Sequence, residues 1–393
     1  AFAAVLVRHG VTTPEGARAF LNPDRDVLHD PLLLPSFEVR SDWTVDHFRE
    51  VLGYARDGRA VVFQFHGIPD PSNPDVLYAG FWERIRYPYR FLSGGPNGGL
   101  YRSTDAGESW TKLENGLPEG DIGKVEVDVF RLDPNIVYAN IEHGFQPNPD
   151  DPAYDDMTQL GTGIYRSDDG GESWTFVNRS NPRPFYYNHI WVDPNHADRV
   201  FQLAENARVS EDGGRTFDRQ FPGIEGDFHA LWIDPTDNRH LLSGTDGGVY
   251  ESFDRAATWQ FKANLPLTQF YRVGIDNAEP FYHVYGGTQD NSTLGAPNQT
   301  NNVNGIRSSD WFITRGGDGF QTRVDPEDPN ILYSISQYAG IVRYDKRSGE
   351  RMDIQPQPAP GEEALRWHWD APLIISPHAP QRLYFAGRRL FRS

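Results

Sequence analysis

The chain of 393 residues contains no cysteine and only two methionines. Without cysteine the protein can form no disulfide, has no thiol nucleophile and cannot bind zinc through thiolates. No apolar run approaches the roughly 20 residues of a membrane-spanning helix, so we expect no membrane insertion. Basic residues are also few, with 37 Lys and Arg against 55 Asp and Glu and a net charge of −18. This negative charge disfavours nucleic acid as a partner.

Glycine, proline and aromatic residues are abundant by contrast. The chain has 38 Gly and 30 Pro, and 13% of its residues are aromatic. This composition is typical of many short strands joined by turns. The length allows two or three average domains, or one large all-β repeat domain. Neutral glycans, cationic groups and metal ions remain possible ligands.

One pattern, Ser-x-Asp-x-Gly-x-(Ser/Thr)-aromatic, occurs four times, and its copies begin at Ser103, Ser167, Ser210 and Ser252. Each copy follows a short alternating apolar stretch such as GLYR, which predicts the turn of a β-hairpin. We expect the Asp to accept backbone N–H bonds within its own turn and the Gly to supply a positive φ. The aromatic residue should cover the seam between neighbouring sheets. Ala256 replaces the glycine of the fourth copy and should strain or reshape that turn. The residues given this structural role are Ser103, Asp105, Gly107, Trp110, Ser167, Asp169, Gly171, Trp174, Ser210, Asp212, Gly214, Phe217, Ser252, Asp254 and Trp259.

A second periodic element is an Asp-Pro-like turn followed by an apolar strand that ends near Tyr. Its seven starts are Asp70, Asp133, Asp193, Asp234, Asp276, Asp325 and Ser376. The spacings of 63, 60, 41, 42, 49 and 51 residues are in the range of four-stranded propeller blades. We therefore predict an all-β chain over residues 70–393, a β-propeller of about seven four-stranded blades whose ring is possibly incomplete.

The first 69 residues lack this periodicity and predict a small α/β segment. Thr13 starts one predicted helix, Thr44 caps a second, and Ala60 to Gly67 is a predicted buried strand. Residues 1–35 resemble the leader of RecJ-type exonucleases, through VTTPEGARAFLNP and LHDPLLLP. Residues 36–69 resemble the end of a polysaccharide-deacetylase-like domain, through DHFREVLGYARDGRAVVFQFHGIPD. Neither stretch carries its family's catalytic motif, so we infer neither activity.

The four-fold pattern resembles the Asp-box, or BNR, repeat of sialidases, xyloglucanase-like glycosidases and sortilin-type receptors. Residues 70–393 resemble exported bacterial BNR-repeat proteins described as sortilin-like (VPS10-like) or glycosyl-hydrolase-like. This resemblance implies a secreted or periplasmic protein, although the opening AFAAVLVRHG is not a signal peptide. The segment WERIRYP around Arg84 is not the Arg-Ile-Pro motif of sialidases, which disfavours that activity.

Function is expected just beyond each Asp-Pro strand, because loops at one end of the inner strands converge on a propeller's channel. Five carboxylates hold this position: Glu83, Glu142, Glu205, Asp246 and Asp290, while the other two blades offer Gln337 and Arg388. Such an acidic funnel suits paired acid and base chemistry at a sugar, or the capture of a cation. The alternative is that these carboxylates only cap turns.

Asp246 and Asp290 are the catalytic candidates, because both lie in glycine-rich segments that allow close approach of a ligand. The remaining ligand-binding candidates are Trp82, Asp227, His229, Asp318, Trp367 and Trp369, besides Glu83, Glu142 and Glu205. For the aromatic residues among them, and for the neighbouring Tyr186 and Tyr187, packing between blades is the alternative.

Two functions follow from these observations. The first is a binding protein that holds a glycan or peptide in an acidic central funnel without catalysis. The second is a glycoside hydrolase that acts on a polysaccharide with a carboxylate pair. No cofactor is implied, and the absence of a zinc-type histidine spacing gives no support for a metal.

Overall fold

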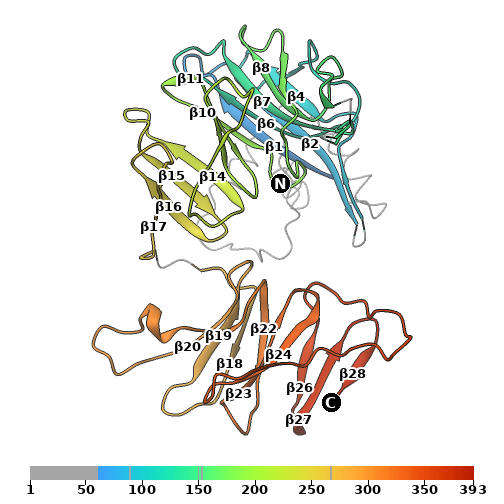
Figure 1. The fold of residues 1–393 in the computed structure, drawn as a ribbon, viewed down its shortest axis with the longest axis vertical. Coiled ribbons are helices and arrows are strands. Elements are labelled where there is room, and N and C mark those ends of the chain that lie inside the picture. Colours follow the sequence, from blue (N-terminus) through green and yellow to red (C-terminus); the bar gives the residue numbers. More distant parts are fainter. Residues whose placement is uncertain (1–60, 88–89, 149, 152–153, 266–267) are drawn as a thin grey trace, which may run out of the picture. The chain divides into compact units, whose positions relative to one another are not determined.

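The computed structural model describes residues 61–87, 90–148, 150–151, 154–265 and 268–393. The two predicted N-terminal helices lie outside these residues. The chain divides into two compact units, Ala1–Phe261 and Lys262–Ser393, called unit 1 and unit 2 below and described separately (Figure 1). Within the described residues both units consist of antiparallel sheets, with two single-turn 3₁₀ helices.

The described part of unit 1 contains four consecutive sheets, A to D (Figure 1). Sheet A comprises β1 (Val61–Pro69), β2 (Leu77–Tyr87), β3 (Arg90–Ser93), β4 (Gly99–Ser103) and β5 (Thr111–Lys112). Sheet B comprises β6 (Ile122–Val129), β7 (Val137–His143), β8 (Gly163–Ser167) and β9 (Thr175–Asn178). Sheet C comprises β10 (His189–Asp193), β11 (His196–Leu203), β12 (Arg208–Ser210) and β13 (Arg219–Gln220). Sheet D comprises β14 (Phe228–Ile233), β15 (Leu241–Thr245), β16 (Gly248–Ser252) and β17 (Gln260–Phe261).

Unit 2 contains three further sheets, E to G (Figure 1). Sheet E comprises β18 (Arg272–Ile275), β19 (His283–Gly287), β20 (Thr293–Pro297) and β21 (Phe312–Arg315), with η3 (Ser308–Asp310) before β21. Sheet F comprises β22 (Gly319–Val324), β23 (Ile331–Ser336), β24 (Gly340–Asp345) and β25 (Arg351–Asp353), with η4 (Gln337–Ala339) before β24. Sheet G comprises β26 (Leu373–Ser376), β27 (Ala379–Ala386) and β28 (Leu390–Arg392).

These seven sheets confirm the predicted all-β fold of β-propeller blades. Each sheet is an up-and-down meander in which strands pair in chain order, except that β3 forms a side hairpin with β2. The Asp-Pro turns join the first and second strands, and their carboxylates accept backbone N–H groups, as Asp70 does from Ser72 at 2.7 Å. The predicted strand from Ala60 is β1, which pairs with β2 from Val61 onward. We expected the propeller to start at residue 70. Sheet A begins nine residues earlier, at Val61.

Hydrophobic cores lie between successive sheets of each unit. Tyr78 and Leu100 of sheet A pack with Val127 and Tyr165 of sheet B in one buried cluster. Further clusters join sheets B and C, sheets C and D, sheets E and F, and sheets F and G. Full burial of one such side chain contributes about 1.5–3 kcal/mol, so these seams hold the sheets together. The Tyr78 hydroxyl also donates across a seam, to the carbonyl of Gly170 at 2.9 Å.

The four repeated turns share one set of hydrogen bonds. In the second copy, Ser167 Oγ accepts the N–H of Gly171 at 2.8 Å and donates to Asp169 Oδ1 at 2.7 Å. The same carboxylate accepts the N–H of Ser173 at 2.9 Å. The copies at Ser103, Ser210 and Ser252 repeat this arrangement. Ala256 keeps the shape of the fourth turn by adopting a φ of +63°, a conformation that costs a non-glycine residue energy.

Candidate functional site

One end of the sheets in unit 1 gathers most of the predicted site residues. The first strands β6, β10 and β14 begin where the second strands β7, β11 and β15 end, as the pairs Ile122–His143, His189–Leu203 and Phe228–Thr245 show. The strand β10 also contacts both β6 and β14. The loops that follow the second strands, which hold Glu205 and Asp246, therefore converge beside the starts of the inner strands.

Glu142 lies near the end of β7 in a hydrogen-bonded network. Its Oε2 accepts the hydroxyl of Ser93 at 2.5 Å and the backbone N–H of Lys124 at 2.8 Å. The Trp82 indole N–H donates to the same Ser93 oxygen at 2.9 Å. Burial raises the pKa of Glu142, which indicates that this carboxylate is poorly solvated. Because Trp82 is only 4% exposed, its position agrees with the packing alternative.

Lys124 fixes an aromatic loop above this network. Its ammonium group is buried and donates to the carbonyls of Tyr187 at 2.6 Å and Tyr186 at 3.2 Å. Burial lowers the pKa of Lys124, since the low-polarity surroundings disfavour its charged form. Lys124 was not among the residues predicted from the sequence. One feature of the sequence could have indicated Lys124 as a site residue. Charged residues alternate along β6 at Lys124, Glu126 and Asp128, which is unusual for an inner strand.

The loop from Arg183 to Asn188 is held at both of its ends. The Asn188 side-chain amide donates to the carbonyls of Lys124 at 2.9 Å and Asn140 at 2.7 Å. Arg183 donates to Glu205 Oε1 at 2.6 Å, and its guanidinium lies 4.8 Å from the centre of the Tyr186 ring. Glu205 is thus an ion-pair partner that positions the loop. The Tyr186 ring is left 40% exposed by this arrangement.

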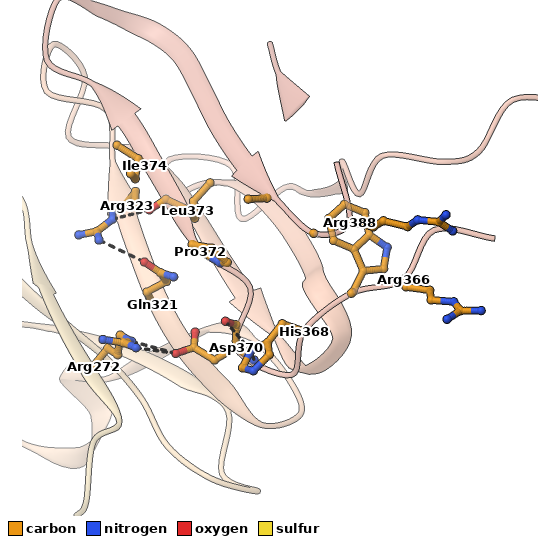
Figure 2. A pocket seen from close by; sticks show the side chains of 13 residues that line it. Arg272, Gln321, Arg323, Arg366, His368, Asp370, Pro372, Leu373, Ile374 and Arg388 are labelled. Carbon is orange, nitrogen blue, oxygen red and sulfur yellow. Dashed lines mark hydrogen bonds and ion pairs between the residues drawn. The ribbon is translucent and has the colours of Figure 1, made fainter. Parts of the chain in front are cut away.

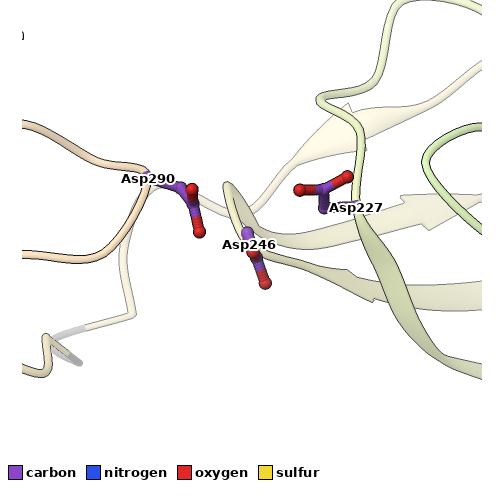
Figure 3. Close-up of side chains that lie close together, drawn as sticks. All are labelled: Asp227, Asp246 and Asp290. Atoms are coloured by element: carbon purple, nitrogen blue, oxygen red, sulfur yellow. The ribbon is translucent and has the colours of Figure 1, made fainter. Parts of the chain in front are cut away.

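Asp227, His229 and Asp246 lie together beside this aromatic loop. The backbone N–H of Asp227 donates to the Glu205 carbonyl, and that of Asp246 donates to the Asp227 carbonyl, both at 3.1 Å. His229 Nε2 lies 3.0 Å from Asp246 Oδ1, and a carboxylate oxygen of Asp227 lies within 4.8 Å of one of Asp246. Figure 3 shows Asp227 before β14 and Asp246 after β15. Asp246 and the pair Asp227 and His229, which were predicted from two separate segments, therefore share one site.

Aromatic rings surround His229 in the same region. Its ring centre lies 5.6 Å from that of Tyr187 and 6.5 Å from that of Tyr186. Tyr187 is fully buried, and burial, followed by the nearby Asp227 carboxylate, raises the pKa of its hydroxyl. The site thus combines a neutral buried tyrosine, an exposed ring, an imidazole and two carboxylates.

The remaining predicted residue of unit 1, Glu83, belongs to a local turn. Its Oε2 accepts the backbone N–H of Asn97 at 3.2 Å. A methyl group on Gly95 would come within 2.3 Å of the Glu83 carboxylate, so the turn packs closely around it. Such an environment agrees with the alternative that the Glu83 carboxylate only caps a turn.

In unit 2, Asp290 and Asp318 lie in adjoining turns. The backbone N–H of Asp290 donates to Asp318 Oδ1 at 2.7 Å, and that of Asp318 donates to Gln337 Oε1 at 3.0 Å. Asp318 is buried, whereas Asp290 is exposed and has a φ of +59°. Asp290 is also drawn in Figure 3, but it belongs to unit 2, whereas Asp246 belongs to unit 1.

The two predicted tryptophans of unit 2 differ in exposure. The Trp367 ring packs against Phe385 and Phe391, at centre distances of 5.2 and 5.4 Å. Trp369 is exposed and contacts the ring of Tyr338 at 4.7 Å. Trp367 therefore supports the core of sheet G, and Trp369 remains a candidate for contact with a ligand.

The chain is similar in sequence to one curated protein and in structure to several solved proteins. No family model matches the chain. A xyloglucanase of Hypocrea jecorina is 25% identical over 287 residues, which cover 66% of this chain and 30% of that protein. A GH74 enzyme of Niastella koreensis has a TM-score of 0.37 and 15% identity, over 83% of this chain and 51% of that one. The YCF48 protein in complex with a D1 peptide has a TM-score of 0.31 and 12% identity, over 84% and 96% of the chains.

The chain thus spans less than a third of the length of the xyloglucanase that it matches. Its sheets alone define the class, an all-β protein built from β-propeller blades. No helix in the described ranges is long and apolar enough for a membrane span.

Proposed function

We propose that unit 1 binds a glycan at the end of its sheets where Tyr186, Asp227 and Asp246 meet. The observation that carries this proposal is an exposed Tyr186 ring that is held in place near His229, whose Nε2 contacts Asp246. Sugar rings offer an apolar face that suits an aromatic surface, and their hydroxyl groups donate hydrogen bonds that carboxylates accept. The similarity to a xyloglucanase supports a β-glucan chain as the ligand class.

Preorganisation supports the same proposal. Lys124 holds the carbonyls of Tyr186 and Tyr187, and Arg183 holds Glu205 while its guanidinium lies over the Tyr186 ring. Because folding already orders this loop, a ligand would lose less free energy to the ordering of side chains when it binds. We also infer that the protein acts outside the cytoplasm, where polysaccharide ligands occur.

Titration of the full chain with xyloglucan oligosaccharides, followed by calorimetry, tests this proposal. We expect saturable binding, and Tyr186→Ala should weaken it by about ten-fold or more, since it removes the aromatic contact. Tyr282→Ala is the matched control, because Tyr282 is 42% exposed against 40% for Tyr186 and lies in unit 2. An equal effect of both variants, or no binding by the unaltered chain, would contradict the proposal.

Hydrolysis of the bound glycan is the second candidate, and the approach of Asp227 to Asp246 favours it. Their separation, within 4.8 Å between oxygens, is nearer to the roughly 5–5.5 Å between carboxyl groups of retaining glycosidases than to the about 6.5–9.5 Å of inverting ones. In this arrangement Asp227 and Asp246 would form the carboxylate pair, and His229 contacts Asp246.

Release of reducing ends from the same oligosaccharides distinguishes the two functions. Binding without hydrolysis predicts no new reducing ends at saturating ligand. Hydrolysis predicts that Asp227→Asn and Asp246→Asn each abolish product release while calorimetric binding remains.

A further inference from the structure

Unit 2 contains a cavity whose charge is opposite to that of the chain. It has a volume of about 1000 Å³, at the upper end of the roughly 300–1,000 Å³ usual for ligand pockets. Four arginines line it, Arg272, Arg323, Arg366 and Arg388, against a single carboxylate, Asp370. In a chain with a net charge of −18, this concentration of guanidinium groups creates a local site for anions.

Two of the arginines are fixed on the inner strands. Arg272 on β18 donates through Nε and Nη2 to Asp370 Oδ2, at 2.9 and 2.8 Å. Arg323 on β22 donates to the Leu373 carbonyl at 3.0 Å and to Gln321 Oε1 at 3.1 Å. Gln321 is itself buried and anchored. These bonds occupy Nε and Nη2 of both arginines, and the carboxylate of Asp370 already pairs with Arg272. Because guanidinium groups that are already oriented lose less freedom on binding, the Nη1 groups of this pair are prepared to contact a further carboxylate.

The other two arginines come from loops of sheet G. The backbone N–H of Arg388 donates to the carbonyl of Arg366 at 3.1 Å, which keeps the two residues side by side. Arg388 is 64% exposed and makes a long contact, 3.5 Å, with the exposed Glu363. Figure 2 shows the pair Arg366 and Arg388 on the opposite side of the cavity from Arg272 and Arg323.

The lining of the cavity also has a large apolar part. Trp367, Pro372, Leu373 and Ile374 contribute to it, beside the polar His368 and Gln321. A small anion such as phosphate would contact one pair at most. A ligand with carboxylates repeated along a chain of apolar-faced rings would contact both pairs and the apolar part of the lining.

We propose that this cavity binds an acidic oligosaccharide, a chain of uronic acid residues whose carboxylates are held by the two arginine pairs. Only the choice of a sugar as the ligand rests on the proposed function. The residues belong to unit 2 and are independent of the Tyr186 site in unit 1.

The test compares binding of a galacturonic acid tetramer with that of its fully methyl-esterified form, which has the same rings without the charges. We expect the acid to bind to the full chain at least about ten-fold more tightly than the ester, and to bind more weakly as salt increases. Arg323→Gln and Arg388→Gln should each lower the affinity for the acid by about ten-fold. Arg382→Gln, at an exposed arginine of β27 outside the cavity, should leave it unchanged.

Arg388→Gln keeps the test decisive if Arg323→Gln fails to fold, because Arg388 is exposed. Equal binding of acid and ester would overturn the proposal, as would inorganic phosphate binding as tightly as the tetramer. Unchanged affinity in both arginine variants would do the same. None of these outcomes would contradict the proposed binding of neutral xyloglucan oligosaccharides at Tyr186, which is tested by its own titration.

Discussion

Replacement of Ser167 by alanine should destabilise the protein by about 2–6 kcal/mol, and this cost can be worked out from the structure. Ser167 is 1% exposed, and its hydroxyl accepts the N–H of Gly171 at 2.8 Å and that of Asp169 at 3.3 Å. It also donates to Asp169 Oδ1 at 2.7 Å. Each lost bond costs roughly 0.5–1.5 kcal/mol, and leaving the buried Gly171 N–H unsatisfied costs about 1–3 kcal/mol.

Ser173→Ala provides the control within the same turn. Its hydroxyl is exposed and donates to Asp169 Oδ2 at 2.5 Å, so its loss leaves no buried group unsatisfied. We expect this variant to cost under about 1 kcal/mol. Equilibrium unfolding in urea, followed by tryptophan fluorescence at one fixed pH, measures both values. Equal costs for the two variants would refute the reasoning that the buried serine holds each repeated turn closed.

Two further predictions concern single residues of unit 1. Gly171→Ala should destabilise the protein more than Gly214→Ala. A methyl group on Gly171 would lie 3.1 Å from the Tyr78 ring, whereas one on Gly214 would come no closer than 3.5 Å to its neighbours. Urea unfolding of both variants measures the difference in the free energy of unfolding. Burial raises the pKa of Asp128 to about 7, although the N–H of Val192 donates to its carboxylate. The native state therefore retains a proton that the unfolded state releases near pH 4, so this group's contribution to the free energy of unfolding falls as the pH rises from about 4 to about 7. A carbon-13 NMR titration of the Asp128 carboxyl group that gave a pKa near 4 would contradict this.

The sheets could be predicted from sequence because their turns are encoded locally. In each repeated turn the serine hydroxyl bonds to the aspartate two residues later and to the backbone N–H four residues later, which belongs to glycine in three copies and to Ala256 in the fourth. The hydrogen bonds of the Asp-Pro turns are equally short-range. Such bonds depend on residue spacing alone. The strand that begins near Ala60 was predicted, but its place in sheet A was not, because the pairing of β1 with β2 is set by strand register.

The candidate site was predicted only in part, because its geometry depends on contacts between sheets. Asp246 was identified from its glycine-rich segment, and Asp227 and His229 were identified together from the segment GDFHALW. Lys124 was missed because its partner Tyr187 is 63 residues away in the chain. The exposure of Trp82 could not be judged either, since its indole is buried through contacts with Ser93 on a separate hairpin strand.

The most direct test of the proposed glycan site is a crystal structure of the full chain with a xyloglucan oligosaccharide at saturating concentration. We predict a sugar ring against Tyr186, with hydroxyl groups within hydrogen-bond distance of Asp227 or Asp246. A sugar bound only elsewhere on the molecule, with the Tyr186 surface unoccupied, would contradict the proposed function.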